Sequence, residues 1–161
     1  MFSDDSGGLS HQGGLIMKTV IFTASLCAAA LCAAGASAQQ SVSLSAGFVP
    51  DPVTVELFSG GGNQASDLGS SCVGTVGSSP DVVLNFSSAG GRLAIGVLAG
   101  TDTSLVINGP DGRFYCNDDN SGLNPGLVWG QAPSGQYDIW VGAVGEAGPA
   151  TLVITEGSLD Y

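Results

Sequence analysis

The sequence predicts an all-β protein, an antiparallel sandwich or barrel of eight or nine strands. Short runs of alternating apolar and polar residues, each about 4–8 residues long, recur with turn signals roughly every 8–12 residues, which is typical of such folds. The 161-residue chain is rich in residues that form turns, with 26 glycines and 7 prolines. After position 38, no long window shows the 3.6-residue period of a helix.

The first predicted strands are separated by a long loop. Ser41–Ala46 is the first strand, and Pro52–Phe58 is the second, with Val and Leu at alternate positions. The loop that follows, residues 60–80, is rich in glycine and serine, and we expect only a short strand in it, near Ser71–Val76. Its glycine triplet has no P-loop lysine after it and is interpreted as turn sequence, not as a phosphate cradle.

The central predicted strands follow one another closely. Asp81–Phe86 and Leu93–Leu98 each place three apolar side chains on one face. Thr103–Ile107 is rich in β-branched residues, which favour half-buried strands. The sequence N-G-P-D-G at 108–112 is a strong turn signal, so Arg113–Cys116 is expected to return as the hairpin partner.

The last predicted strands complete the fold. An acidic loop, residues 117–125, precedes a short strand at Gly126–Gly130. A P-S-G turn leads into Gln136–Val144, and Thr151–Thr155 is the final strand. The apolar residues expected to share the buried faces are Leu93, Ile95, Val97, Leu105, Ile107, Tyr137, Ile139, Val141, Leu152 and Ile154.

Residues 17–38 are predicted to be a secretory signal peptide. Lys18 provides a basic start, Thr19–Ala34 is an apolar run, and the A-S-A sequence that ends at Ala38 is a cleavage signal. The alternative is a membrane anchor, but the run is short for a span and ends in a cleavage signature. We expect the mature chain to begin at Gln39.

The segment before the leader adds nothing to it. Residues 1–16 precede a complete signal peptide, so we interpret them as an upstream extension and expect translation to start at Met17 rather than Met1. Residues 39–161 are then expected to form a single β-sandwich domain in the periplasm or outside the cell. Once cleaved, this domain is expected to have no stable insertion in a membrane.

The charge of the mature region excludes several partners. Removing residues 1–38 takes away Asp4, Asp5 and Lys18, which leaves 12 acidic residues against Arg92 and Arg113 and a net charge of −10. Such a chain has no basic surface to neutralise the phosphates of nucleic acid. It is equally unsuited to an anionic lipid surface.

The region after residue 38 also lacks histidine and lysine. A Ser-His-Asp or Cys-His centre needs an imidazole, and a Schiff base needs a lysine. Zinc bound through histidine is excluded for the same reason. Paired carboxylates are the one catalytic alternative that stays open, and we expect a protein that is not an enzyme.

Cys72 and Cys116 are an even pair in a chain expected to be exported, which predicts a disulfide. On the chain-entropy estimate, closing a loop of this length contributes roughly 4 kcal/mol. The alternative is a reactive thiol, for which Arg113 would be the cationic neighbour.

Oxygen-bearing side chains gather near the predicted hairpin and the loop that follows it. Carboxylates and amides are the ligands that Ca²⁺ prefers, so a calcium site is one interpretation, although the EF-hand pattern fails because Trp129 stands where it needs a glutamate. The alternative is that these side chains cap their own turns. The residues are Asp111, Asn117, Asp118, Asp119, Asn120 and Asn124.

Trp129 and Trp140 are the two candidate ligand-binding aromatics. Trp140 alternates with the apolar face of its strand, and Trp129 closely follows the acidic loop. An exposed pair could stack on a sugar or a peptide. The alternative is that loops or the facing sheet cover both indoles.

The segment 102–144, which contains L-V-I-N-G-P-D-G, C-N-D-D and Y-D-I-W-V-G, resembles the bacterial pre-peptidase C-terminal domain, a β-sandwich appended to secreted peptidases. It is also similar to small exported proteins of proteobacteria that are sometimes labelled serine peptidases. The resemblance implies a jelly-roll-like sandwich with an accessory or binding role. It does not carry over the peptidase activity, because the histidine of a triad is missing.

Together these observations predict an exported, non-catalytic binding or accessory module whose partner is a protein or a polysaccharide. The alternatives are a Ca²⁺-stabilised carbohydrate-binding module and a domain that acts together with a secreted serine protease. An enzyme that uses paired carboxylates would require two acids about 5–10 Å apart in a cleft.

Overall fold

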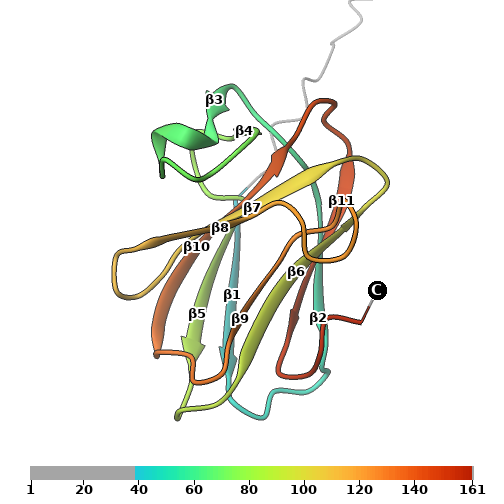
Figure 1. The fold of residues 1–161 in the computed structure, drawn as a ribbon. Coiled ribbons are helices and arrows are strands. Elements are labelled where there is room, and N and C mark those ends of the chain that lie inside the picture. The colour runs from blue at the N-terminus through green and yellow to red at the C-terminus, as the bar shows by residue number, and fades with distance from the viewer. Residues whose placement is uncertain (1–38, 161) are drawn as a thin grey trace, which may run out of the picture. The chain divides into compact units, whose positions relative to one another are not determined.

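The computed structural model describes residues 39–160, which form two packed β-sheets (Figure 1). The predicted signal peptide at 17–38 and the upstream extension at 1–16 lie outside the described residues. No helix within 39–160 is long and apolar enough to span a bilayer. The strands are β1 (Gln40–Ser45), β2 (Val53–Phe58), β3 (Asn63–Gln64), β4 (Thr75–Val76), β5 (Val82–Ser87), β6 (Leu93–Ala99), β7 (Thr103–Asn108), β8 (Phe114–Asn117), β9 (Gly126–Trp129), β10 (Gly135–Ala143) and β11 (Pro149–Thr155), with a short 3₁₀ helix, η1 (Ala65–Asp67).

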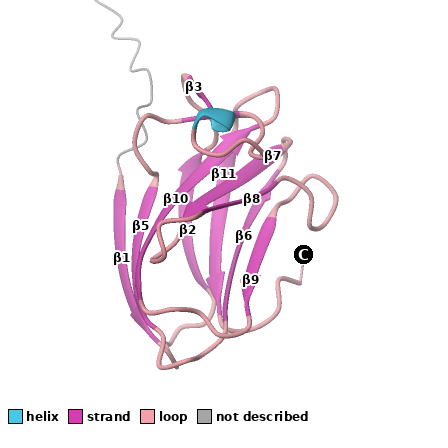
Figure 2. Ribbon diagram, turned by 60° about the vertical axis from the view of Figure 1, so that its left-hand side comes forward, coloured by secondary structure: helices cyan, strands magenta, loops and turns pink. Residues whose placement is uncertain are grey.

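The strand order is that of a jelly roll. One sheet runs β1-β5-β10-β7-β8, with the short β4 and β3 added beyond the end of β10, and the other runs β2-β11-β6-β9. If β2 and β5–β11 are renumbered 1 to 8, the first sheet contains the order 2-7-4-5 and the second has the order 1-8-3-6. These are the strand orders of the double Greek key that defines a jelly roll. Figure 2 shows β1, β5 and β10 on one side and β6 and β9 on the other. The predicted all-β sandwich is confirmed.

One strand pair differs from the antiparallel expectation. β1 and β5 run parallel, from Gln40 opposite Val82 to Ser45 opposite Ser87. After β1 the chain crosses to the other sheet to form β2, and it returns beside β1 only at β5. No hairpin joins these two strands, so the antiparallel constraint of a tight turn is absent.

The predicted core is confirmed. All ten residues named from the alternating pattern have no exposed surface and belong to one apolar cluster between the sheets. The alternating apolar pattern identified these residues because each strand in these sheets turns one face toward the other sheet. The predicted hairpin is also present, with β7 and β8 paired so that Val106 lies opposite Cys116.

A second, smaller apolar cluster lies on the outer face of the first sheet. The segment between β2 and β5 carries β3, η1 and β4 and buries Ala65, Cys72 and Val76 against Val106 and Trp140. Figure 2 shows η1 at this end of the molecule. The short strand predicted near Ser71–Val76 is present only as β4, and β3 was not predicted, since a two-residue strand leaves no alternating pattern to read.

A disulfide joins Cys72 to Cys116 and fastens this segment to β8. The two Cα atoms lie 5.2 Å apart, and the residues are separated by 44 positions. The predicted pairing is confirmed, and the reactive-thiol alternative is not. Because disulfides persist in oxidising compartments, the bridge points to a protein that is exported.

Candidate functional site

The structure does not bring the predicted calcium ligands into one cluster. Asp111 lies in the turn before β8, whereas Asn117–Asn120 begin at the other end of that strand. A strand rises about 3.3 Å per residue, so β8 holds the two groups apart. The hydroxyl of Tyr115 donates a 2.7 Å hydrogen bond to Asp111 Oδ2, and the Arg113 N–H donates to Oδ1 at 3.1 Å. The bond from Tyr115, followed by that from Arg113, lowers the pKa of Asp111.

The amides of the acidic loop are already used within the fold. Asn117 Oδ1 accepts the Gly126 N–H at 2.8 Å, and its Nδ2 donates to the Asp119 carbonyl at 3.3 Å. Asn124 Oδ1 accepts the Ala99 N–H at 3.0 Å. Within 39–160, no three His, Cys, Asp or Glu side chains are grouped so that they could hold a metal ion. These hydrogen bonds favour the turn-capping alternative over the calcium site.

The two tryptophans lie in separate places. Trp140 is 8% exposed, beneath the segment between β2 and β5, and its ring centroid lies 6.1 Å from that of Phe114. It therefore offers no open face for stacking, which agrees with the covered alternative. Trp129 is half-buried between Tyr115 and Tyr137, at centroid distances of 5.4 and 5.5 Å.

Asp111 and Trp129 are thus linked through Tyr115, although the sequence treated them as separate candidates. Beyond Trp129 the row of rings ends at Tyr137, whose hydroxyl donates to the Pro133 carbonyl at 2.7 Å. Burial, followed by the charge of Asp111, raises the pKa of Tyr137 to about 12. This row of rings closes the edge of the sandwich where β8 and β9 meet. We interpret it as structural packing and not as a ligand site.

A concavity among the described residues was not predicted from the sequence. A hollow of about 500 Å³ lies where β2 ends and β1 and β5 begin. Two stretches of chain form most of it, residues 58–61 and residues 77–81, and Gln39 and Ala147 complete the lining. Phe58, 50% exposed, provides an aromatic surface, while Ser78 and Ser79 add polar groups. We refer to it as the Asp81 hollow, after the one ionisable side chain that lines it.

Glycine and serine allow the walls of the Asp81 hollow to lie close together. A Cβ atom on Gly61 would lie 2.3 Å from backbone atoms of Val76, so only glycine fits there. Ser59 is buried, and its Oγ donates to the Gly148 carbonyl at 3.1 Å while accepting the Gly148 N–H at 3.0 Å. These contacts join the loop after β2 to the β4–β5 connection and to the start of β11.

Asp81 is the central side chain of the hollow. It is 7% exposed, and its Oδ2 accepts the Val141 N–H at 2.9 Å. Burial raises its pKa to about 6, although the hydrogen bond from Val141 acts in the opposite direction. Oδ1 accepts no hydrogen bond from residues 39–160, and since Thr101 Oγ1 is the one fully buried unpartnered side-chain atom among them, Oδ1 keeps contact with solvent in the hollow. The carboxyl group is therefore largely, but not completely, removed from water.

The sequence contained no clear signal for the burial of Asp81, which was assigned only to the start of a predicted strand. Asp81 stands immediately before the apolar run V-V-L. Adjacent side chains of a strand point to opposite faces, so the burial of Val82 does not predict that of Asp81. The partners that complete the hollow come from distant parts of the chain and left no local pattern.

Comparison with known proteins finds a relative but no family. No family model matches the chain. It is 38% identical over 86 residues to an uncharacterized protein from Synechococcus elongatus, a match that covers 51% of this chain and 59% of that protein. The chain thus spans less than two thirds of that relative's length.

Two solved structures are similar to this one. The pre-peptidase C-terminal domain of a collagenase from Bacillus anthracis is 15% identical, with 73% of this chain and 95% of that domain covered and a TM-score of 0.47. PliG from Aeromonas hydrophila, a periplasmic inhibitor of g-type lysozyme, is 12% identical, with 73% and 98% covered and a TM-score of 0.39. The first is a domain of the kind that segment 102–144 resembles. Neither likeness is strong enough to assign a ligand.

Proposed function

We propose that this chain is an exported, non-catalytic β-sandwich module that binds a protein or polysaccharide partner through the Asp81 hollow. The observation that carries the proposal is a buried carboxyl group with a raised pKa, placed in a hollow of about 500 Å³. Ligand pockets commonly have volumes of this order. Groups with perturbed pKa values gather at functional sites.

Binding accounts for the hollow better than catalysis does. Hydrolysis by two acids needs a pair of carboxyl groups, and Asp81 is the one ionisable side chain among the residues that line the hollow. Residues 39–160 contain no histidine or lysine to act as a partner base. What the lining does offer is an exposed aromatic ring, hydroxyl groups and backbone amides, which suit recognition.

Export is supported by two independent features. The Cys72–Cys116 disulfide requires an oxidising compartment to persist. The apolar run and cleavage signal before Gln39 have the form of a secretory leader. N-terminal sequencing of the exported protein is expected to begin at Gln39, and a chain that retained residues upstream of Met17 would contradict the predicted start.

The binding role can be tested with two exposed apolar residues of the same sheet. The full chain would be screened against soluble polysaccharides and against purified extracellular proteins, and each hit would be measured again with Phe58→Ser and Val128→Ser. Phe58 and Val128 are 50% and 51% exposed, on β2 and β9 respectively, and only Phe58 lines the hollow.

We expect Phe58→Ser to weaken binding by about tenfold, roughly 1.4 kcal/mol, and Val128→Ser to leave it unchanged. A partner that binds both variants as well as it binds the wild type would show that the hollow is not the site. Turnover of any partner that is abolished by Asp81→Asn would contradict the non-catalytic role.

A further inference from the structure

We infer that the Asp81 hollow receives the side chain of an arginine presented by a basic partner protein. This inference rests on the proposed binding function and names the chemistry of its ligand. It depends on the surroundings of the carboxyl group, on the exposed ring of Phe58 and on the charge of the whole described region.

The first argument is the second oxygen of Asp81. Oδ2 is held by the Val141 N–H at 2.9 Å, while Oδ1 accepts no hydrogen bond from residues 39–160 and stays accessible from the hollow. A carboxylate removed from water is unfavourable unless it is paired. A cationic ligand supplies both a charge and N–H donors for Oδ1, so its binding and the ionisation of Asp81 favour each other.

No basic side chain of residues 39–160 already fills this role, and the α-amine that Gln39 would carry in the mature protein is the one competing cation that lines the hollow. Arg92 donates to the carbonyl groups of Glu156 and Gly157, and Arg113 pairs with Asp111 at 3.7 Å, so both basic residues of 39–160 are engaged outside the hollow.

The other ionisable side chains on the elements that form the hollow are Glu56 on β2, Asp138 on β10 and Glu146 in the turn before β11, and all of them are carboxylates. None of these side chains supplies a positive charge that would compete with a cationic ligand.

Arginine fits the lining better than lysine does. A guanidinium group is planar, so it can stack on an aromatic ring while its N–H groups bond to a carboxylate. Phe58 is 50% exposed at the hollow, and Asp81 supplies the carboxylate. The volume of about 500 Å³ leaves space for the side chain and part of its backbone.

The charge of the whole region indicates a basic protein as the partner. Residues 39–160 carry 12 acidic and two basic side chains. A surface with this excess attracts positively charged partners over distances comparable with the Debye length, about 8 Å at physiological salt, and accelerates their association. It repels acidic polysaccharides and nucleic acids by the same mechanism.

The test compares two peptides that differ in charge but hardly in shape. Acetyl-Gly-Arg-Gly-amide and its citrulline counterpart would be titrated by calorimetry into the full chain, purified as it is exported, at pH values from about 5 to 7.5. We expect the arginine peptide to bind at least about tenfold more tightly than the citrulline peptide. Its affinity should rise with pH through the range near 6 in which Asp81 ionises.

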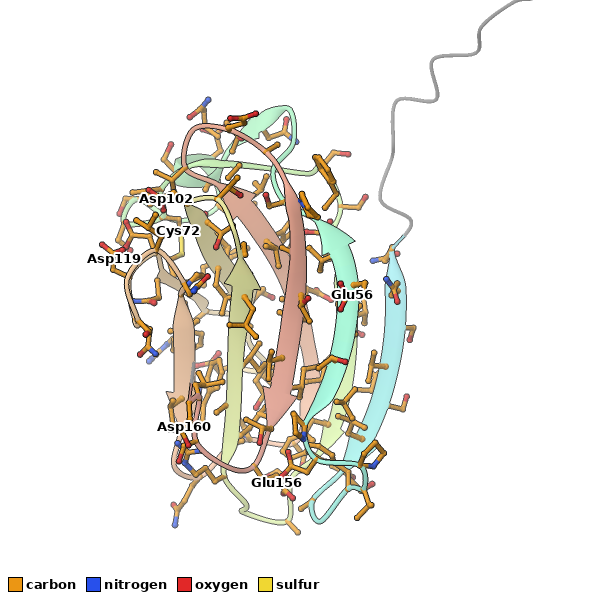
Figure 3. All side chains as sticks on the ribbon, turned by 90° about the vertical axis from the view of Figure 1, so that its right-hand side faces the viewer. Glu56, Cys72, Asp102, Asp119, Glu156 and Asp160 are labelled. Atoms are coloured by element: carbon orange, nitrogen blue, oxygen red, sulfur yellow. A yellow bond between two sulfur atoms is a disulfide. The ribbon has the colours of Figure 1, made fainter. Side chains whose placement is uncertain are left out.

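Two variants that each remove one negative charge separate the hollow from general charge effects. We expect Asp81→Asn to weaken binding of the arginine peptide by about tenfold or more. Asp160→Asn is the control, because Asp160 is exposed and lies toward the other end of the strands from the tip of β2 (Figure 3). It should bind as the wild type does.

Several outcomes would overturn the inference. They are equal binding of the citrulline peptide, an unchanged affinity for Asp81→Asn, and no binding at millimolar peptide. Binding only to a chain whose Gln39 α-amine has been acetylated would show that the chain's own terminus fills the site. A polysaccharide that depends on Phe58 but not on Asp81 would remove the arginine inference and leave the binding function intact.

Discussion

The backbone N–H of Val141 donates a 2.9 Å hydrogen bond to Oδ2 of Asp81. The N–H of Asp81 in turn donates to the Ile139 carbonyl at 2.8 Å, so the residue is tied to β10 through both its backbone and its side chain. This arrangement fixes the carboxyl group at the mouth of a hollow and removes most of its contact with water. It also couples the stability of the protein to the protonation of one side chain.

Replacing Asp81 with asparagine is expected to stabilise the protein at neutral pH. Burial raises the pKa of Asp81 from 3.8 to about 6. Between these values the folded chain keeps a proton that the unfolded chain has released, so this residue's contribution to stability declines as the pH rises through the window. An asparagine oxygen can still accept the Val141 N–H, and it carries no charge.

Urea unfolding at several pH values would measure this effect. We expect the free energy of unfolding of Asp81→Asn to exceed that of the wild type by on the order of 1 kcal/mol above pH 6. This difference should shrink as the pH falls toward 4. Asp160→Asn, which removes an exposed charge, is the control and should have a free energy of unfolding close to that of the wild type. A variant that is less stable than the wild type at neutral pH would contradict the desolvation of Asp81.

Removing the disulfide is expected to lower stability and to loosen the segment between β2 and β5. The bridge closes a loop of 44 residues, for which the chain-entropy estimate is about 4 kcal/mol. Trp140, 8% exposed beneath this segment, would report the change through a red shift of its fluorescence. The unfolding midpoint and the fluorescence of the wild type would be compared with those of the double variant Cys72→Ser/Cys116→Ser. Dithiothreitol should change both quantities in the wild type and neither in the variant. An unchanged unfolding midpoint in the double variant would be inconsistent with this role.

Two neighbouring glycines provide a matched test of how the hollow is built. A Cβ on Gly61 would lie 2.3 Å from the backbone of Val76, whereas a Cβ on Gly62 would meet nothing within 4 Å. Overpacking of this kind typically destabilises by about 1–3 kcal/mol, so Gly61→Ala should unfold at lower urea and lose any ligand of the hollow. Gly62→Ala should resemble the wild type in both measurements. Equal behaviour of the two variants would show that the walls are not closely packed.

Calcium is expected to leave the melting temperature of the protein unchanged. The side-chain oxygens of Asn117 and Asn124 already accept backbone N–H groups at 2.8 and 3.0 Å, so they are poorly placed to turn toward an ion. Thermal unfolding at millimolar Ca²⁺ and in excess chelator would measure the shift. A ligand that binds the folded state raises the melting temperature, so a rise of several degrees that Asp119→Asn removes would establish a calcium site in this loop.

The acidic cluster shows how far residue type can predict a site. Carboxylates and amides at 111 and at 117–120 are close along the chain, and both segments border β8. Whether they meet depends on the strand between them, which is extended and keeps its two ends apart. Residue type indicated which ions these groups could bind, and the backbone path decided that they do not form one group.

The sequence by itself determined the class of fold, the ten residues at the centre of the core and the pairing of Cys72 with Cys116. The fold class and the core follow from the alternation of side chains along each strand, and the pairing follows because only two of the four cysteines lie after residue 38. Only the tertiary structure decided that β1 runs parallel to β5, that Trp140 is covered, and that Asp81 faces a hollow. These depend on which distant segments meet. The lining of the hollow comes from residues as far apart as Gln39 and Ala147, and no local pattern encodes that contact.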